Sequence, residues 1–134
     1  MATCRRCGLA LAYCGHFQPR MPTAASPIGQ CAAPRVRNLV YSAMLQSLPL
    51  SSQHYRQLRD RGLSDNEIQS HGYRTLPRHR RSSCARRLVD QFGSETCAQI
   101  PGLYQVVQGG CQYWNLAGSP GLLIPVRDRQ GHIV

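Results

Sequence analysis

The sequence predicts an α+β fold, in which a cysteine-rich leader precedes a helical N-terminal half and a small antiparallel β-sheet left incomplete at the C-terminus. Two observations set the fold class: apolar residues recur at helical spacing up to residue 92, and the period shifts toward two after Pro101. A third is that the last apolar run, residues 132–134, has only just begun when the sequence stops. The 134 residues suit one domain, here 35–134, with a small appendage, 1–34.

The leader carries a candidate metal site. Cys4-x-x-Cys7 has the knuckle spacing that lets two thiolates hold one ion, and Cys14-x-His16 follows after six residues. Three thiolates and one imidazole complete a tetrahedral zinc site, and Cys31 is an alternative to His16 as the fourth ligand. The competing interpretation is a set of free surface thiols. We predict one zinc ion per chain, which metal analysis of protein purified without chelator would detect.

The domain is predicted to open with two helices. The first starts at residue 35 and ends before Pro49, with apolar residues at helical spacing: Val36, Leu39, Val40, Ala43 and Met44. The second runs from residue 51 or 52 to residue 61. Either serine can act as its N-cap, and Gly62 can end it in a left-handed conformation.

Two further helices have clear end signals. Ser64 and Glu67 have the spacing of a capping box, in which each side chain bonds the other residue's exposed amide, and Gly72 ends that helix. After a basic stretch broken by a proline, a serine at position 82 or 83 is predicted to cap a helix that ends at Phe92.

The last third of the chain is predicted to form strands. Three runs with β-type patterning cover residues 103–107, 111–116 and 122–126, and the Gly-Gly pair at 109–110 predicts a hairpin between the first two. The fourth run, 132–134, needs a pairing partner for its backbone groups. The cysteines of the domain are predicted to be buried as small apolar residues: Cys84, Cys97 and Cys111.

Charge points to a polyanionic partner. The chain has 16 basic and 6 acidic residues, a formal charge of +10, and all of the basic residues are arginine. Arginine matches phosphate geometry and stacks on bases, so nucleic acid is the simplest partner. Tyr113 and Trp114 would favour a single strand if they stack on bases. The densest cluster is either a phosphate-binding site or a solvated face: Arg78, Arg80, Arg81, Arg86 and Arg87.

Other features narrow the class of protein. No run of about 18 apolar residues occurs, so a membrane partner is not expected. The N-terminus lacks a basic region followed by an apolar core, so the expected location is the cytoplasm. Seven cysteines without a secretory signal favour metal binding or free thiols over disulfides.

Two segments in order carry a resemblance to a known family. Residues 61–73, RGLSDNEIQSHGY, resemble the opening of the catalytic core of bacterial replicative primases, and residues 121–134, GLLIPVRDRQGHIV, resemble a hairpin of that core. The apolar-glycine segment 100–104 lies between them. A closer likeness is to toprim-like proteins of plasmids, phages and integrated elements, in which a stretch like residues 40–51, VYSAMLQSLPLS, precedes the glycine-leucine helix.

The resemblance covers roughly residues 35–134 and implies a primase-like DNA replication module of a mobile genetic element, truncated before its TOPRIM module. It implies DNA as partner, preferably single-stranded, and a downstream TOPRIM or helicase polypeptide as a further partner. It implies magnesium only in a full-length relative. Two-metal phosphoryl transfer needs closely placed carboxylates, and the six here form no such pair in the sequence, so no catalytic residue is assigned.

Two alternatives remain open. Helices 51–61 and 64–72 around Gly62 would suit a small helix-turn-helix regulator that binds DNA. A gene fragment without a function of its own is the other alternative.

Overall fold

The computed structural model describes residues 31–134, so the predicted zinc ligands Cys4, Cys7, Cys14 and His16 lie outside the described residues. The described part has the predicted α+β fold. Its helices are α1 Pro34–Ser47, α2 Ser52–Asp60, α3 Asp65–His71, α4 Arg81–Phe92 and α5 Ser94–Ala98. Its strands are β1 Arg74–Leu76, β2 Leu103–Gln108, β3 Cys111–Leu116 and β4 Gly121–Leu123.

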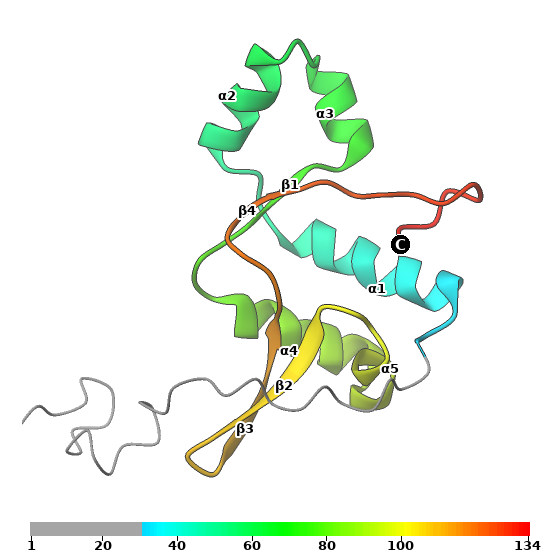
Figure 1. Ribbon diagram of the computed structural model, residues 1–134, viewed down its shortest axis with the longest axis vertical. Coiled ribbons are helices and arrows are strands. Elements are labelled where there is room, and N and C mark those ends of the chain that lie inside the picture. Colours follow the sequence, from blue (N-terminus) through cyan, green and yellow to red (C-terminus); the bar gives the residue numbers. More distant parts are fainter. Residues whose placement is uncertain (1–30) are drawn as a thin grey trace, which may run out of the picture.

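The elements are arranged along the long axis of the molecule (Figure 1). The α2–α3 hairpin occupies one end and the β2–β3 hairpin the other, with α1, α4 and α5 in between. The strands form two antiparallel sheets of two strands each, β1 with β4 and β2 with β3. In the first sheet Arg74 lies opposite Leu123, and in the second Leu103 lies opposite Leu116. The strands of the last third therefore divide between two sheets.

The core joins all the central elements. Helices α1, α4 and α5 and strands β1, β2 and β3 contribute to one cluster of buried residues, in which Val40, Cys97 and Ile100 are the largest fully buried side chains. The α2–α3 hairpin buries Leu58 and Ile68, neither of which belongs to that cluster. The buried residues of the hairpin thus lie outside the main core.

Helix α1 has a different buried face from the predicted one at two positions. Val40 is fully buried as predicted, but Leu39 is 59% exposed, and Leu45 is buried in its place. The spacing of apolar residues predicted the helix, but it could not show that one of them lies outside the contact with α4. Leu39 is therefore a surface residue.

The ends of α2 and α3 follow the predicted local chemistry. The Ser51 hydroxyl accepts a hydrogen bond from the His54 amide, so Ser51 is the N-cap of α2. At α3 the capping box is complete, because the Ser64 hydroxyl accepts from the Glu67 amide while the Glu67 carboxylate accepts from the Ser64 amide at 2.7 Å. The side-chain and backbone hydrogen bonds from Ser64 hold the pKa of Glu67 below its usual value. Gly72 ends α3 with φ 74°.

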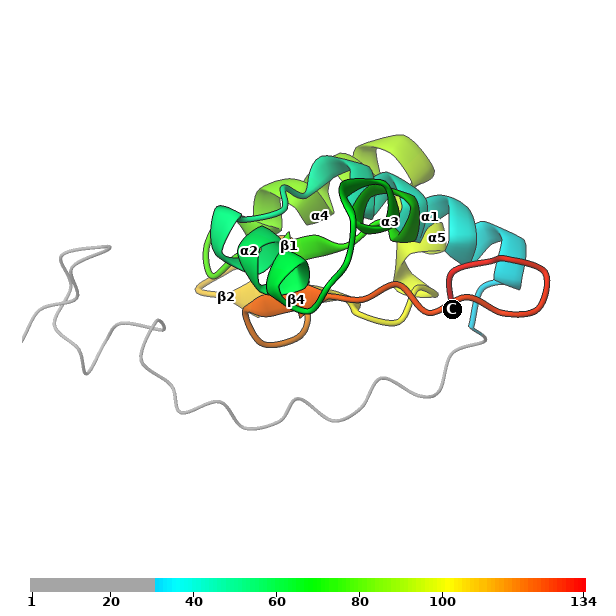
Figure 2. The same ribbon diagram turned by 90° about the horizontal axis from the view of Figure 1, so that it is seen from above.

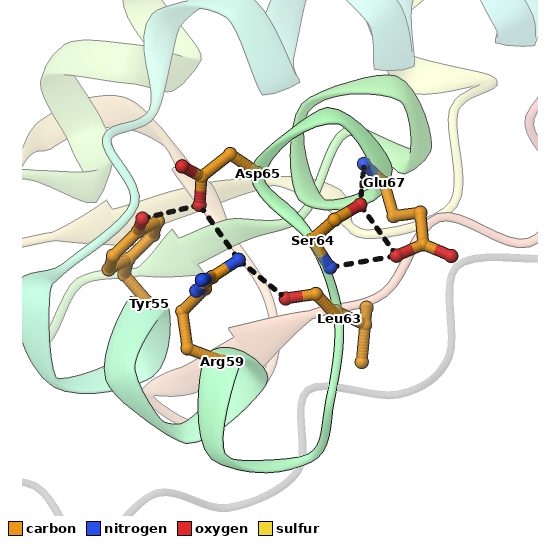
Figure 3. A network of polar contacts seen from close by, with 6 residues as sticks. All are labelled: Tyr55, Arg59, Leu63, Ser64, Asp65 and Glu67. Atoms are coloured by element: carbon orange, nitrogen blue, oxygen red, sulfur yellow. Dashed lines mark hydrogen bonds and ion pairs between the residues drawn. The ribbon is translucent and has the colours of Figure 1, made fainter.

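A polar network joins the two helices of the hairpin (Figure 3). Asp65 at the start of α3 accepts a hydrogen bond from the Tyr55 hydroxyl at 2.5 Å and pairs with Arg59 at 3.3 Å. Arg59 also donates to the Leu63 carbonyl in the connecting turn. The hydrogen bond to Asp65 raises the pKa of Tyr55. The carboxylate of Asp65 and the guanidinium of Arg59 therefore form an ion pair within the hairpin.

Strand β1 was not predicted, and it ties the hairpin to the rest of the fold. The Thr75 amide donates to the Pro49 carbonyl at 2.8 Å, and the Thr75 hydroxyl oxygen accepts from the Ser51 amide at 2.9 Å. Arg74 donates from Nε to the Leu45 carbonyl. The pairing of β1 with β4 supplies the remaining contacts, and β4 is about 45 residues away in the sequence. A strand of three residues has no local sequence pattern from which such a distant partner could be predicted.

The predicted last strand forms a narrow hairpin with the residues that precede it. Arg127 and Ile133 make an isolated β-bridge, and the Val134 amide donates to the Val126 carbonyl at 3.0 Å. Ile133 is buried, and its amide donates to the Asn38 side chain of α1 at 2.9 Å. In Figure 2 the red C-terminal segment accordingly lies beside the cyan α1. The backbone amides of residues 132–134 therefore all have hydrogen-bond partners within the described chain.

Asp128 organises the turn of this C-terminal hairpin. Burial pushes its pKa upward, but hydrogen bonds from the His132 amide at 2.8 Å, the Gln130 amide at 2.9 Å and the His132 ring outweigh that effect. The net pKa of Asp128 lies below its usual value. The ionised carboxylate is thus the form that the folded turn favours.

This turn predicts a pH-dependent stability. A carboxyl whose pKa is depressed by folding stabilises the protein fully above its unfolded pKa, and that contribution is lost as pH falls through the folded pKa. We expect Asp128→Asn to lower the free energy of unfolding at pH 7, and the difference from the wild type to shrink toward pH 3. Urea denaturation at both pH values measures it. An equal difference at both pH values would contradict the assignment.

The cysteine predictions are confirmed at two positions and wrong at the third. Cys84 and Cys97 are buried in the main core, and burial raises the pKa of the Cys97 thiol. Cys111 is exposed, because it lies at the first position of β3, directly after the Gly109–Gly110 turn. Cys31 is also exposed.

Among the helices between residues 31 and 134, none has both the length and the apolar character needed to cross a membrane.

Candidate nucleic-acid interface

A broad, open groove lies between the start of α4 and strand β3. Its volume is about 1110 Å³. One wall is formed by the segment before α4 and the first turns of that helix, and the other by the end of β2, the turn and β3. The lining residues are Arg78, His79, Arg80, Arg81, Ser82, Ser83, Arg86, Val89, Gln108, Gly109, Cys111, Gln112, Tyr113, Trp114 and Asn115.

Four of the five predicted phosphate-binding arginines line this groove, and Arg87 does not. Arg78, Arg80 and Arg86 are exposed, and neither of the two ion pairs found among residues 31–134 involves them. Segment 74–87 holds six arginines and no carboxylate. The groove wall therefore has positive charge that no acid of the described chain neutralises, and such a surface attracts polyanions.

Arg81 has a different role from the other arginines. Its Nε donates to the Pro77 carbonyl at 2.6 Å, and its Nη1 donates to the Gly118 carbonyl at 2.5 Å. The second bond joins the start of α4 to the loop after β3, where an added Cβ at Gly118 would lie 3.3 Å from the Leu76 side chain. The sequence placed Arg81 among the phosphate ligands, and its two hydrogen bonds give it the further role of holding the groove wall in place.

Helix α4 begins two or three residues earlier than predicted, and not at a serine cap. Its first residue is Arg81, its N-cap is Arg80, and no side chain of the described residues caps it. Arg80 has φ 63° and is the one non-glycine residue of the described chain with positive φ. Residues other than glycine and asparagine adopt this left-handed conformation at a cost of about 1–2 kcal/mol. An arginine at this strained position projects from the groove wall, and strain of this kind is common where function demands a particular residue.

The strain at Arg80 predicts that stability and binding can be separated. Asparagine tolerates the left-handed conformation, so we expect Arg80→Asn to raise the free energy of unfolding by up to about 1 kcal/mol. The same change removes one positive charge from the groove and should weaken the binding of nucleic acid. Urea denaturation and fluorescence anisotropy with a labelled oligonucleotide measure the two effects. Lower stability together with unchanged affinity would refute this account of Arg80.

The second wall of the groove is aromatic and amide-rich. Tyr113 is 36% exposed, whereas Trp114 is half-buried and packs against the main core together with Val89. Tyr113 is thus the more accessible of the two aromatic residues that line the groove. The sequence named both residues as candidates for stacking, but it gave no reason to place them opposite the arginines.

The carboxylates are distributed over four helices and one turn. All six of the chain lie in the described part: Asp60, Asp65, Glu67, Asp90, Glu95 and Asp128. Asp65, Glu67 and Asp128 are engaged in the local hydrogen bonds described above. Between residues 31 and 134 no group of three or more histidine, cysteine or acidic side chains is placed to hold a metal ion.

Comparisons with known proteins return no match. No family model matches the chain, and neither the curated proteins nor the solved structures include one that is significantly similar.

Proposed function

We propose that the chain is a DNA-binding module of a primase-like replication protein from a mobile genetic element, and that it holds no catalytic site of its own. The observation that carries the proposal is the groove, which faces Arg78, Arg80 and Arg86 toward the aromatic wall of β3 without a neutralising carboxylate. Exposed arginines bind phosphates, and aromatic rings stack on unpaired bases. Single-stranded DNA is therefore the preferred ligand.

The placement of the acids supports the proposed lack of a catalytic site. Magnesium at a phosphoryl-transfer site is held by carboxylates that lie close together. Asp65 pairs with Arg59, Glu67 caps α3 and Asp128 orders a turn, so these three already serve local structure. In this proposal magnesium and the TOPRIM or helicase activity belong to a separate polypeptide or to a longer relative. Zinc bound by Cys4, Cys7, Cys14 and His16 stays a prediction.

The alternative, a helix-turn-helix regulator, has weaker support. The α2–α3 hairpin has the required shape, with a turn at Gly62 between two short helices (Figure 1). However, residues 51–73 hold three arginines and three carboxylates, so the hairpin has no net charge apart from its histidines. Two of those carboxylates, Asp65 and Glu67, lie in the first turn of α3, the turn that would approach DNA in such a regulator. Phosphates would be repelled there.

Two assays on the full chain test the proposal. Fluorescence anisotropy across a salt series should show affinity for a single strand that falls steeply with salt and depends little on base sequence. Preferential binding to duplex DNA, with loss of affinity in Arg56→Ser/Arg61→Ser, would favour the helix-turn-helix alternative. A primer-synthesis assay with magnesium or manganese should yield no product. Template-dependent product from this chain would overturn the claim that it has no catalytic site.

A further inference from the structure

The outer edge of β3 has backbone groups that no strand of the described chain covers. The β2–β3 hairpin pairs Gln108 with Cys111 across a two-residue turn, and the Ala117 amide donates to the Gly102 carbonyl at 2.8 Å. In an antiparallel pair, hydrogen-bonded and non-hydrogen-bonded pairs alternate. Counting by twos from the hydrogen-bonded pair Gly102–Ala117 reaches the hydrogen-bonded pairs 104–115, 106–113 and 108–111. The pairs between them, Val107–Gln112 and Gln105–Trp114, are therefore non-hydrogen-bonded pairs. The amides and carbonyls of Gln112 and Trp114 therefore point away from β2.

The groove runs along this edge. Five consecutive residues of β3, from 111 to 115, line it, whereas β2 contributes only Gln108 at its end. Consecutive residues of a strand point to alternate faces, so a groove that touches all five flanks the edge of the strand and not one face. On the far side, Ser82, Arg86 and Val89 form one stripe along α4. A strand added beside β3 would extend the ribbon over this stripe.

We propose that this groove also binds an extended acidic peptide, which adds to β3 as a third strand. The free amides and carbonyls of Gln112 and Trp114 would pair with the peptide backbone, as in strand addition at other open sheet edges. The charge of the groove selects the peptide, because Arg78, Arg80 and Arg86 favour carboxylates.

Alternation along a strand specifies the peptide further. Side chains at every second position point to the same face, so acidic residues on the α4 side can meet the arginines, while the residues between them point to the opposite face of the ribbon, where Tyr113 lies. The expected ligand is a segment in which aspartate or glutamate alternates with valine or isoleucine. Peptide and DNA use the same arginines, so they should compete. This inference does not rest on the proposed function, because edge pairing requires no nucleic acid.

The test uses the full chain and a fluorescently labelled seven-residue peptide, Asp-Val-Glu-Val-Asp-Val-Glu, followed by anisotropy. The control peptide has the same sequence and charge but is N-methylated at its central residues, which removes the backbone donors. We expect the methylated peptide to bind at least about tenfold more weakly, as two lost backbone hydrogen bonds predict. Equal binding of the two peptides would show attraction by charge alone and would overturn the proposal.

A matched pair of protein variants tests the edge itself. Gln112→Pro removes an outward amide of β3, and Val107→Pro removes the outward amide at the opposite position on β2. Proline is tolerated at edge positions of this kind, and circular dichroism checks each fold. Only Gln112→Pro should weaken the binding of the unmethylated peptide. Equal affinity of both variants for the unmethylated peptide would refute strand addition. If either variant fails to fold, the comparison of the methylated and unmethylated peptides on the wild-type chain decides the question. Binding of single-stranded DNA without binding of the peptide would refute this inference and leave the proposed function standing.

Discussion

Replacing Arg78, Arg80 and Arg86 together by serine should reduce the affinity for single-stranded DNA about a hundredfold, at roughly 1 kcal/mol for each exposed charged contact. The slope of log affinity against log salt should fall by about 2, because each phosphate contact on a single strand releases about 0.7 counterion. The three side chains are exposed and lack ion-pair partners among residues 31–134, so their loss should leave stability nearly unchanged. Fluorescence anisotropy over a salt series measures both quantities.

A charge-matched control separates the groove from the overall charge. Arg56, Arg61 and Arg129 are also exposed but do not line the groove. Their joint replacement by serine removes the same net charge, and we expect a much smaller loss of affinity. Similar losses in the two triple variants would mean that the protein attracts DNA through its total charge, without a defined groove.

Arg81→Met should destabilise the fold by about 2 kcal/mol, although Arg81 belongs to the same arginine cluster in the sequence. The substitution keeps an aliphatic stem and removes the donors to the carbonyls of Pro77 and Gly118. Hydrogen bonds from a charged donor contribute about 1.5–3 kcal/mol each when buried, and the Gly118 contact is solvent-exposed, so the lower part of that range applies to the pair. Urea denaturation followed by circular dichroism gives the change in unfolding free energy.

Arg81→Lys provides the comparison for this prediction. Lysine keeps the charge but has a single ammonium group, which cannot reach two separated carbonyls as the guanidinium fork does. We therefore expect Arg81→Lys to lower the free energy of unfolding nearly as much as Arg81→Met does. Wild-type stability in Arg81→Lys, or loss of DNA affinity in an Arg81→Met variant as stable as the wild type, would show that Arg81 acts as a phosphate ligand and not as a structural residue.

Local chemistry explains which parts of the fold could be predicted. The boundaries of α2 and α3 depend on Ser51, Ser64, Glu67 and Gly72, which act within one helical turn of their own position. The β2–β3 hairpin depends on a two-residue turn of the same kind. By contrast, β1 is a strand only because β4 pairs with it, and the exposure of Leu39 depends on which face of α1 meets the core. Such information is absent from any short window of sequence.

The candidate site could also be predicted only in part, because its residues were visible in the sequence but their arrangement was not. The density of arginines between residues 78 and 87 was visible in the sequence, and so were Tyr113 and Trp114 as aromatic candidates. Their meeting across one groove depends on the packing of β3 against α4, which brings together segments about 30 residues apart. The special role of Arg81 was also hidden, because one of its two carbonyl partners, Gly118, lies 37 residues away.

The pairing of β1 with β4 has a consequence for the order in which the chain folds. Helices α2 and α3 and the β2–β3 hairpin close short loops, whereas the β1–β4 ladder must bring together segments about 45 residues apart. Closing a longer loop costs more chain entropy, so we expect this ladder to form late, after both hairpins. During synthesis the first strand would emerge well before its partner, and the helical hairpin would stay loosely attached until residues 121–123 leave the ribosome. Conservative substitutions at Leu76 and Leu123 should therefore speed unfolding and leave the folding rate nearly unchanged.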